Sequence, residues 1–212
     1  MSMDVSGWEV RLDDGIIEGY AASGQWTGVT LRQLAAGCAR DFPERIAVVD
    51  GDVQLRFGEV FEQALRLASA LRRRGVNGGD VVSFQLPNWH ETVIINLAAA
   101  IGGFVCNPIV PIYRDAEVGF ILKQSRAKAL FIPETFRGIG YRDMVERLRA
   151  DLPGLEHVIC LRPASGSDEF QEWLREDGAA IEDFSDPDAN AVKLLLYTSG
   201  TTGEPKGVLH SH

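Results

Sequence analysis

The stretch of this sequence best suited to chemistry is a loop rich in glycine, serine and threonine that ends in a lysine. It follows an apolar run over residues 192–197 and reads Thr198-Ser199-Gly200-Thr201-Thr202-Gly203-Glu204-Pro205-Lys206-Gly207. Glycines let several backbone N–H groups point into one concavity, and the hydroxyl groups add further donors. Such a cradle suits phosphate oxygens, and Lys206 adds a flexible positive charge that can neutralise a nucleotide tail or a departing pyrophosphate.

The loop differs from the common nucleotide-binding P-loop. That motif ends in Gly-Lys-Ser/Thr, whereas Lys206 stands between Pro205 and Gly207. Membership of the kinase or GTPase classes is therefore disfavoured. A plain surface turn would account for the glycine and hydroxyl content, but not for the whole ordered string directly after an apolar strand.

The segment from Tyr197 to His212, YTSGTTGEPKGVLHSH, resembles the phosphate-loop signature of AMP-forming acyl-CoA synthetases. This adenylating superfamily includes firefly luciferase and the adenylation domains of peptide synthetases. The resemblance covers the chain from about Trp26 to His212, because four upstream strings agree with it in order: Phe57-Gly-Glu-Val, Gly79-Asp80-Val81, Leu86-Pro87-Asn88 and Asn107–Arg114. The last of these strings is closer to cyclohexanecarboxylate, medium-chain acid and dihydroxybenzoate-activating ligases than to luciferase.

The resemblance implies an ATP-dependent ligase. Such an enzyme joins a carboxylic acid to the α-phosphate of MgATP, releases pyrophosphate, and passes the acyl group from the acyl-adenylate to the thiol of CoA. The carboxylic acid, ATP, Mg²⁺ and CoA are thus the expected substrates and cofactors. Lys206 would offset the charge on the leaving pyrophosphate, and the residues expected to hold the β- and γ-phosphates are Thr198, Ser199, Gly200, Thr201, Thr202 and Gly203.

The length of the chain, 212 residues, is less than half that of full members of this family. We therefore expect residues 1–29 to be an N-terminal extension and residues 30–212 to be an incomplete N-terminal adenylate-forming domain that ends at the phosphate loop. The C-terminal domain would be absent, and with it the family's adenine pocket and adenylation lysine. The isolated chain is expected to be inactive and to self-associate through sheet surface that its missing half would cover.

Three alternatives stay open. The parent protein could be the adenylation domain of a peptide synthetase or an aryl-acid AMP ligase rather than a CoA ligase. The chain could also be a non-catalytic module that binds ATP or pyrophosphate without turnover.

Composition and charge narrow the class of partner. Apolar residues make up 45% of the sequence and charged residues 24%, which is typical of a folded globular domain. The net charge of −9 disfavours nucleic acid and anionic lipid surfaces. The longest apolar stretch, Val93 to Val105, is too short for a bilayer span of about 20 residues, and the acidic N-terminus lacks a targeting signal, so we expect a cytoplasmic protein without a transmembrane segment.

The other reactive side chains are expected to have structural roles. The sequence has three cysteines, Cys38, Cys106 and Cys160. They lie among aliphatic neighbours and lack the paired spacing of a metal site or a disulfide framework. His210 and His212 lie close to the loop but are expected to pack or to be solvated, as are His90 and His157. The run Arg72-Arg73-Arg74 favours a solvated helix end over an anion site.

The elements that position the loop alternate between helix and strand from Thr30 onward, which predicts an α/β fold with helices covering a mainly parallel sheet. Thr30 and Gln33 fit a capping box, and the helix that follows would carry Leu31, Leu34, Ala35 and Cys38 on one face. Further helices are expected over 57–74, 89–101, 115–124 and 140–150. Strands are expected over 46–49, 81–86, 129–132, 157–161 and 192–197, and irregular chain over 163–168 and 182–188.

Overall fold

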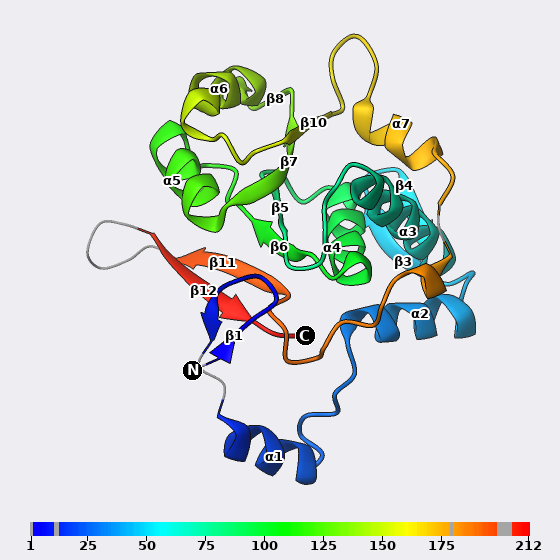
Figure 1. Cartoon of the computed structure of the whole chain (residues 1–212). Coiled ribbons are helices and arrows are strands. Elements are labelled where there is room, and N and C mark those ends of the chain that lie inside the picture. The colour runs from blue at the N-terminus through cyan, green and yellow to red at the C-terminus, as the bar shows by residue number, and fades with distance from the viewer. Residues whose placement is uncertain (1, 11–12, 179, 199–204) are drawn as a thin grey trace.

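A computed structural model describes residues 2–10, 13–178, 180–198 and 205–212, and its largest sheet lies between two groups of helices (Figure 1). The strands of this sheet lie in the order β10 (His157–Leu161), β7 (Ala127–Pro133), β5 (Val81–Phe84), β6 (Val105–Pro108), β11 (Leu194–Thr198) and β12 (Lys206–His210). The first five run parallel, and β12 pairs antiparallel with β11 at the edge. The predicted α/β class with a mainly parallel sheet is confirmed.

Helices cover both faces of the sheet, as parallel strands require. On one face α3 (Phe57–Arg73), α4 (His90–Gly102) and α7 (Glu169–Arg175) pack over the strands, and α2 (Leu31–Asp41) packs on α3 and α4. On the other face lie α5 (Asp115–Ser125) and α6 (Tyr141–Leu148).

Short elements complete the described chain. They are β1 (Ser2–Met3), β2 (Glu9–Val10), α1 (Asp14–Ala22), β3 (Ile46–Asp50), β4 (Val53–Arg56), β8 (Thr135–Phe136), β9 (Ile139–Gly140) and the 3₁₀ turns Arg149–Asp151 and Ile181–Asp183. None of the helices in the described part of the chain has the length and apolar character needed to cross a membrane.

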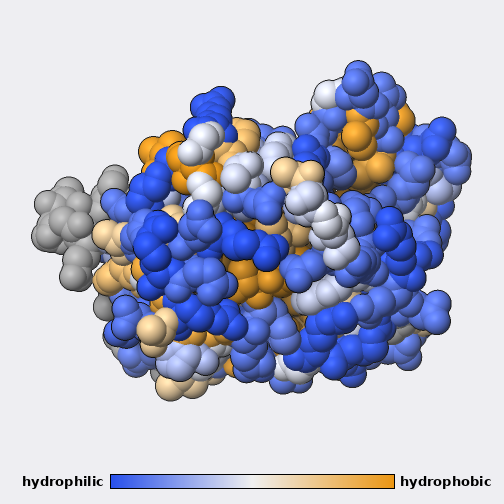
Figure 2. Space-filling model, turned by 90° about the horizontal axis from the view of Figure 1, so that it is seen from above, coloured by the Kyte–Doolittle hydropathy of each residue, from blue (hydrophilic) through white to orange (hydrophobic). Residues whose placement is uncertain are grey.

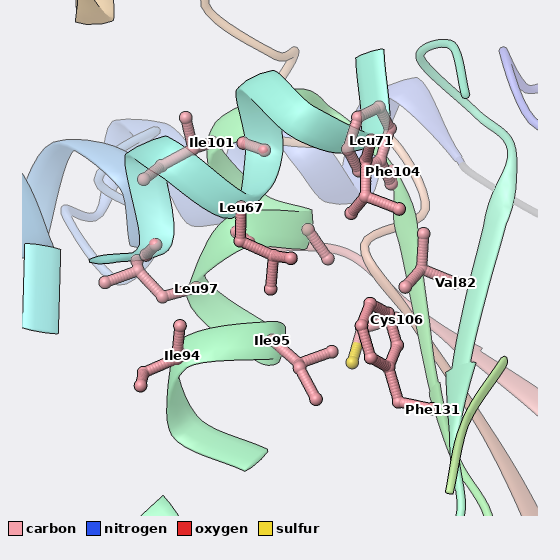
Figure 3. Close-up of a cluster of buried hydrophobic side chains, with 14 of the residues drawn as sticks. Leu67, Leu71, Val82, Ile94, Ile95, Leu97, Ile101, Phe104, Cys106 and Phe131 are labelled. Atoms are coloured by element: carbon pink, nitrogen blue, oxygen red, sulfur yellow. The ribbon is translucent and has the colours of Figure 1, made fainter. Parts of the chain in front are cut away.

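The core is split in two by the sheet, because successive side chains of a strand point to opposite faces. On β7, Ala129 and Phe131 join the α3–α4 side, whereas Leu130 and Ile132 join the α5–α6 side. Figure 3 shows side chains of α3 and α4 gathered beside Val82, Cys106 and Phe131 of the sheet. The surface seen from above the view of Figure 1 is mainly hydrophilic, with hydrophobic residues in the hollows (Figure 2).

The capping box of α2 is confirmed, and of the four residues predicted to share one face of this helix three are half-buried and Leu34 is exposed. The Gln33 N–H donates to Thr30 Oγ1 over 3.3 Å, and the Thr30 N–H donates to Gln33 Oε1 over 3.0 Å. Leu34 is 57% exposed, whereas Arg32 is buried. Arg32 takes the buried position because its guanidinium donates to the carbonyls of Ser185 and Ile181 and lies 3.3 Å from the Asp186 carboxylate.

Two elements on the C-terminal side were not predicted. Helix α7 begins at an Asp168 cap, whose carboxylate accepts from the Gln171 N–H, and it buries Phe170 and Leu174. Strand β12 begins at Lys206, so this lysine lies on a strand of a hairpin and not in a free loop. The segment 163–168 is irregular, as predicted.

The N-terminal segment 2–10 is joined to the body of the molecule. Val10 is buried in the core on the α5–α6 side, and the Asp4 carboxylate accepts from the Val192 N–H over 3.1 Å. Gly79, from the Gly-Asp-Val string that precedes β5, has a φ of +85°, and a Cβ built there would lie 2.5 Å from the Val5 carbonyl oxygen. A side chain at this position would therefore displace the N-terminal segment.

We predict that Gly79→Ala destabilises the fold more than Gly75→Ala does. Both glycines have nearly the same positive φ, +85° and +86°, so both variants meet the same left-handed strain of roughly 1 kcal/mol. Only at Gly79 does the new methyl group meet backbone, since nothing lies within 4 Å at Gly75, and the clash should cost about 1–3 kcal/mol more. Urea unfolding measures the difference, and equal losses in the two variants would contradict the packing of Val5 on Gly79.

Candidate functional site

The hairpin β11–β12 brings the two ends of the predicted phosphate loop together. Thr198 is the last residue of β11 and pairs directly with Lys206, the first residue of β12. Both side chains are exposed, so the hydroxyl and the ammonium are open to a ligand at the mouth of the loop. The other predicted phosphate-binding residues, Ser199, Gly200, Thr201, Thr202 and Gly203, lie outside the described residues.

The packing around Gly207 explains why a glycine follows Lys206. Gly207 pairs with Tyr197, and a Cβ at Gly207 would lie 2.9 Å from Leu195 Cδ1 and 3.5 Å from Tyr197 Cζ. Because Gly207 has no side chain, Leu195 and Tyr197 have room to pack beside its backbone.

A pocket of about 610 Å³ lies beside this hairpin. Its aromatic lining comes from Trp8, Phe120 and Tyr197, and Lys206 lies at its edge. Burial raises the pKa of Tyr197 to about 12, so its hydroxyl stays neutral at physiological pH. The site thus combines the Lys206 ammonium with an aromatic wall, and Glu9 and Gln124 add a carboxylate and an amide to the same lining.

The histidines near the hairpin are tied to backbone groups. The Leu31 N–H donates to His212 Nδ1 over 3.4 Å, and the His212 N–H donates to the Ala189 carbonyl over 3.2 Å. Burial, with a smaller contribution from Lys193, lowers the pKa of His212. His212 therefore caps α2 as a neutral ring, which agrees with the structural role predicted for it.

The thiols in the core are in their neutral form. Burial raises the pKa of Cys106 to about 12 and also raises the pKa of Cys160, and all three cysteines are free. A thiol that does not ionise is a poor nucleophile and a poor metal ligand. The prediction of unreactive core thiols holds for these two residues.

A cluster of charged groups that the sequence did not reveal lies at the N-terminus of α4. Arg162 donates to Glu91 Oε1 over 2.7 Å and to Asp50 Oδ2 over 2.9 Å, and its guanidinium lies 4.1 Å from the ring centroid of Trp89. His90 Nδ1 lies 2.9 Å from Asp50 Oδ2. We call Asp50, His90, Glu91 and Arg162 the Arg162 cluster.

The spacing of the Arg162 cluster alone would suit a metal ion. Ligand atoms of Asp50, His90 and Glu91 lie within 4.8 Å of one another. The Arg162 guanidinium, however, donates to both carboxylates, and a divalent cation placed among them would be repelled by its charge. The cluster is an ion-pair network that joins the end of β3, the start of α4 and the residue after β10.

The arginine run at the end of α3 is bound within the protein and is not an anion site. The Arg72 guanidinium donates to the Asp183 carbonyl, and Arg73 and Arg74 both pair with the Glu176 carboxylate. These bonds lower the pKa of Glu176 to about 2, with Arg74 as the main cause. Arg72 and Arg73 are exposed, in agreement with the predicted solvated helix end, and the run also fastens the segment after α7 to α3.

The fold and the hairpin together define an α/β domain in which the glycine- and hydroxyl-rich segment after β11 connects the last two strands of the chain. Residues 36–212 match the family described as AMP-binding enzyme, and the chain belongs to this family. This agrees with the resemblance found in the sequence.

Relatives of known activity are acid-activating ligases. The medium-chain fatty-acid–CoA ligase of Escherichia coli is 31% identical over 91% of this chain and 35% of its own length. The salicyl-AMP ligase of Mycobacterium tuberculosis is 34% identical over 91% of this chain and 35% of its own length. The apo structure of MbtA from Mycobacterium smegmatis superposes with a TM-score of 0.85 and 29% identity over 96% of this chain and 37% of that chain. The chain thus spans about a third of the length of these relatives.

We predict that Asp50→Asn destabilises the fold at pH 7 and that this loss fades in acid. Hydrogen bonds from His90 and then Arg162 lower the pKa of Asp50 from 3.8 to about 2. A carboxyl group with a lowered folded-state pKa stabilises the fold above its unfolded pKa, and this contribution is lost as pH falls toward its folded pKa. The destabilisation should therefore be about 2 kcal/mol at pH 7 and should shrink between about pH 4 and pH 2.

Asp41→Asn is the matched control for this experiment. Asp41 also pairs with an arginine, Arg40, but both side chains are more than half exposed. Urea unfolding at pH 7, 5, 3 and 2 should show little effect of this variant at any pH. A loss in Asp50→Asn that stays constant down to pH 2 would contradict the ion-pair network.

Proposed function

We propose that this chain is the N-terminal part of an AMP-forming carboxylic acid:CoA ligase, which makes an acyl-adenylate from a carboxylic acid and ATP and transfers the acyl group to CoA. The observation that carries the proposal is the pairing of Thr198 with Lys206 at the mouth of the loop. Identity of 31% to a fatty-acid–CoA ligase supports the reaction class.

The exposed site fits the charge of a nucleotide tail. Lys206 is exposed, and it has no ion pair among the residues that the structure describes. Its ammonium is therefore free to meet phosphate oxygens, and it would offset charge on the departing pyrophosphate. The loop residues from Thr198 to Gly203 would supply hydroxyl and N–H donors. ATP would supply the reactive phosphate when bound, and no residue of this chain is assigned to Mg²⁺.

An aryl-acid AMP ligase is the second candidate. The identity of 34% to the salicyl-AMP ligase favours it. Both candidates share acid adenylation and differ in the acid and in the acceptor of the acyl group. Location in the cytoplasm and self-association of the chain stay predictions.

We predict that Lys206→Ala weakens binding of MgATP at least tenfold, because the variant removes a charge from the mouth of the loop. In a protein that contains the complete domain, the same variant should lower the rate of ATP–pyrophosphate exchange by about 10²–10³, as loss of one charge-stabilising group does elsewhere. Calorimetry measures the first effect and isotope exchange the second. Lys123→Ala, at an exposed lysine on α5, is the control. Equal effects of the two variants would refute the role of Lys206.

We also predict that the 212-residue chain does not turn over by itself, because it spans only about 35% of the length of its ligase relatives. Neither pyrophosphate exchange nor acyl-CoA formation should exceed the background of the assay. Activity that disappears in Lys206→Ala would belong to this chain and would overturn the prediction.

A further inference from the structure

A second cavity of about 610 Å³ lies at the end of the sheet away from the glycine- and hydroxyl-rich loop. Its lining includes residues that lead into three parallel strands, namely 76–78 before β5, 102–104 before β6 and 191–192 before β11. The loop instead follows the last residue of β11. The five residues of this strand separate the cavity from the loop by roughly 17 Å. We call this space the Asp188 cavity, and Lys206 is not part of its lining.

The apolar part of the Asp188 cavity is built from core side chains. The buried hydrophobic residues in its lining are Val10, Val76, Phe104, Phe184 and Val192. A cavity with an apolar floor and a few polar groups is the usual form of a small-molecule site. The polar groups decide which ligand fits.

Two carboxylates of the lining differ in how much of their hydrogen-bonding capacity the protein uses. Asp4 accepts from the N–H and the hydroxyl of Ser6 and from the Val192 N–H. Asp188 accepts from the Asn190 N–H over 2.9 Å through Oδ1 alone. Within the described ranges of the chain, neither carboxylate pairs with a cation. The Asp188 Oδ2 atom is therefore suited to a donor from a ligand.

The charged groups of the lining do not balance. They are three carboxylates and one guanidinium, from Asp4, Asp186, Asp188 and Arg72. A second guanidinium, that of Arg32, lies 3.3 Å from the Asp186 carboxylate. Burial lowers the pKa of His212, so its ring, which also lines the cavity, adds no charge. Three carboxylates thus face two guanidinium groups, and one negative charge is left over.

The end of α4 adds further acceptors. The N–H groups of residues 104–106 would continue the helical ladder, but they donate to the carbonyls of Ala99, Asp80 and Lys193. The carbonyls of residues 100–102 therefore have no partner inside the helix, and the last of these residues lines the cavity. The C-terminal end of a helix carries partial negative charge and favours a cation.

We propose that the Asp188 cavity binds a primary aliphatic amine in its ammonium form. An ammonium group has three N–H donors and no acceptor, so it matches a free carboxylate oxygen and the carbonyl end of α4. The ammonium donates to Asp188 Oδ2, and the aliphatic body lies on Val76 and Phe104. One positive charge balances the one negative charge that the lining leaves over.

The test compares hexan-1-amine with hexan-1-ol, which has the same chain and no charge. Calorimetric titration of the 212-residue chain should show saturable, one-to-one binding of hexan-1-amine. Asp188→Asn should weaken it at least tenfold, whereas Asp52→Asn, at an exposed acid between β3 and β4, should leave it unchanged. Hexan-1-ol should bind the wild type and Asp188→Asn equally. The proposal is wrong if hexan-1-amine does not bind, or if the two aspartate variants affect its binding equally, because the amine would then follow only the net charge of the protein.

A second pair of variants tests the cavity itself. Ala191→Trp places a large side chain in the lining and leaves every charge in place, so it should abolish binding of hexan-1-amine. Ala22→Trp, at an exposed position of α1, should have no effect. Wild-type binding in a folded Ala191→Trp protein would overturn the proposal. None of these variants changes the hairpin, so failure of MgATP binding would count only against the proposed function.

Discussion

The arrangement of the molecule depends on one helix that has no polar face. Eight residues of α4 are buried, including the unbroken run from Leu97 to Ile101, so the C-terminal half of the helix is covered on every side. The sheet covers one side, and α3 and α2 cover the other. This constraint fixes the layer order, because a helix that is apolar all round is stable only between two layers. It also determines where the polar residues of α4 lie: Glu91 faces Arg162 at the start of the helix, and Asn96 faces Lys193 in its middle.

Elements set by local chemistry were predictable from the sequence. The Thr30–Gln33 capping box and the apolar stripe of α3 each carry their own signal, and the structure places these helices within one or two residues of the prediction. Strand β12 carries no such signal, because its apolar content is low and it becomes a strand only through pairing with β11. The exposure of Leu34 and the burial of Arg32 were unpredictable for a similar reason. Helical periodicity does not predict that Arg32 contacts three oxygen atoms of residues more than 140 positions away in sequence.

In the candidate site, too, the features formed by residues close in sequence were predictable and those formed by distant residues were not. Thr198 and Lys206 were found from the sequence because they are close in it, and the hairpin brings them into register. The Arg162 cluster was not found, because it joins Asp50, Glu91 and Arg162 from three distant parts of the chain. The arginine run after Leu71 shows that the type of residue alone does not settle its role. The same guanidinium groups could serve an external anion, but Glu176 and the Asp183 carbonyl already occupy them.

Lys193, which precedes β11, and Lys206, the first residue of β12, show how burial gives identical side chains different surroundings. Lys206 is exposed at the mouth of a loop, so its flexible side chain can change position and keep its ammonium close to a negative charge on a ligand. Lys193 is held by Asn96 in an apolar setting, where an electrostatic interaction is stronger because water is excluded. Burial therefore gives the two ammonium groups different surroundings, because Lys206 is open to solvent whereas Lys193 is fixed inside the protein by a hydrogen bond to Asn96.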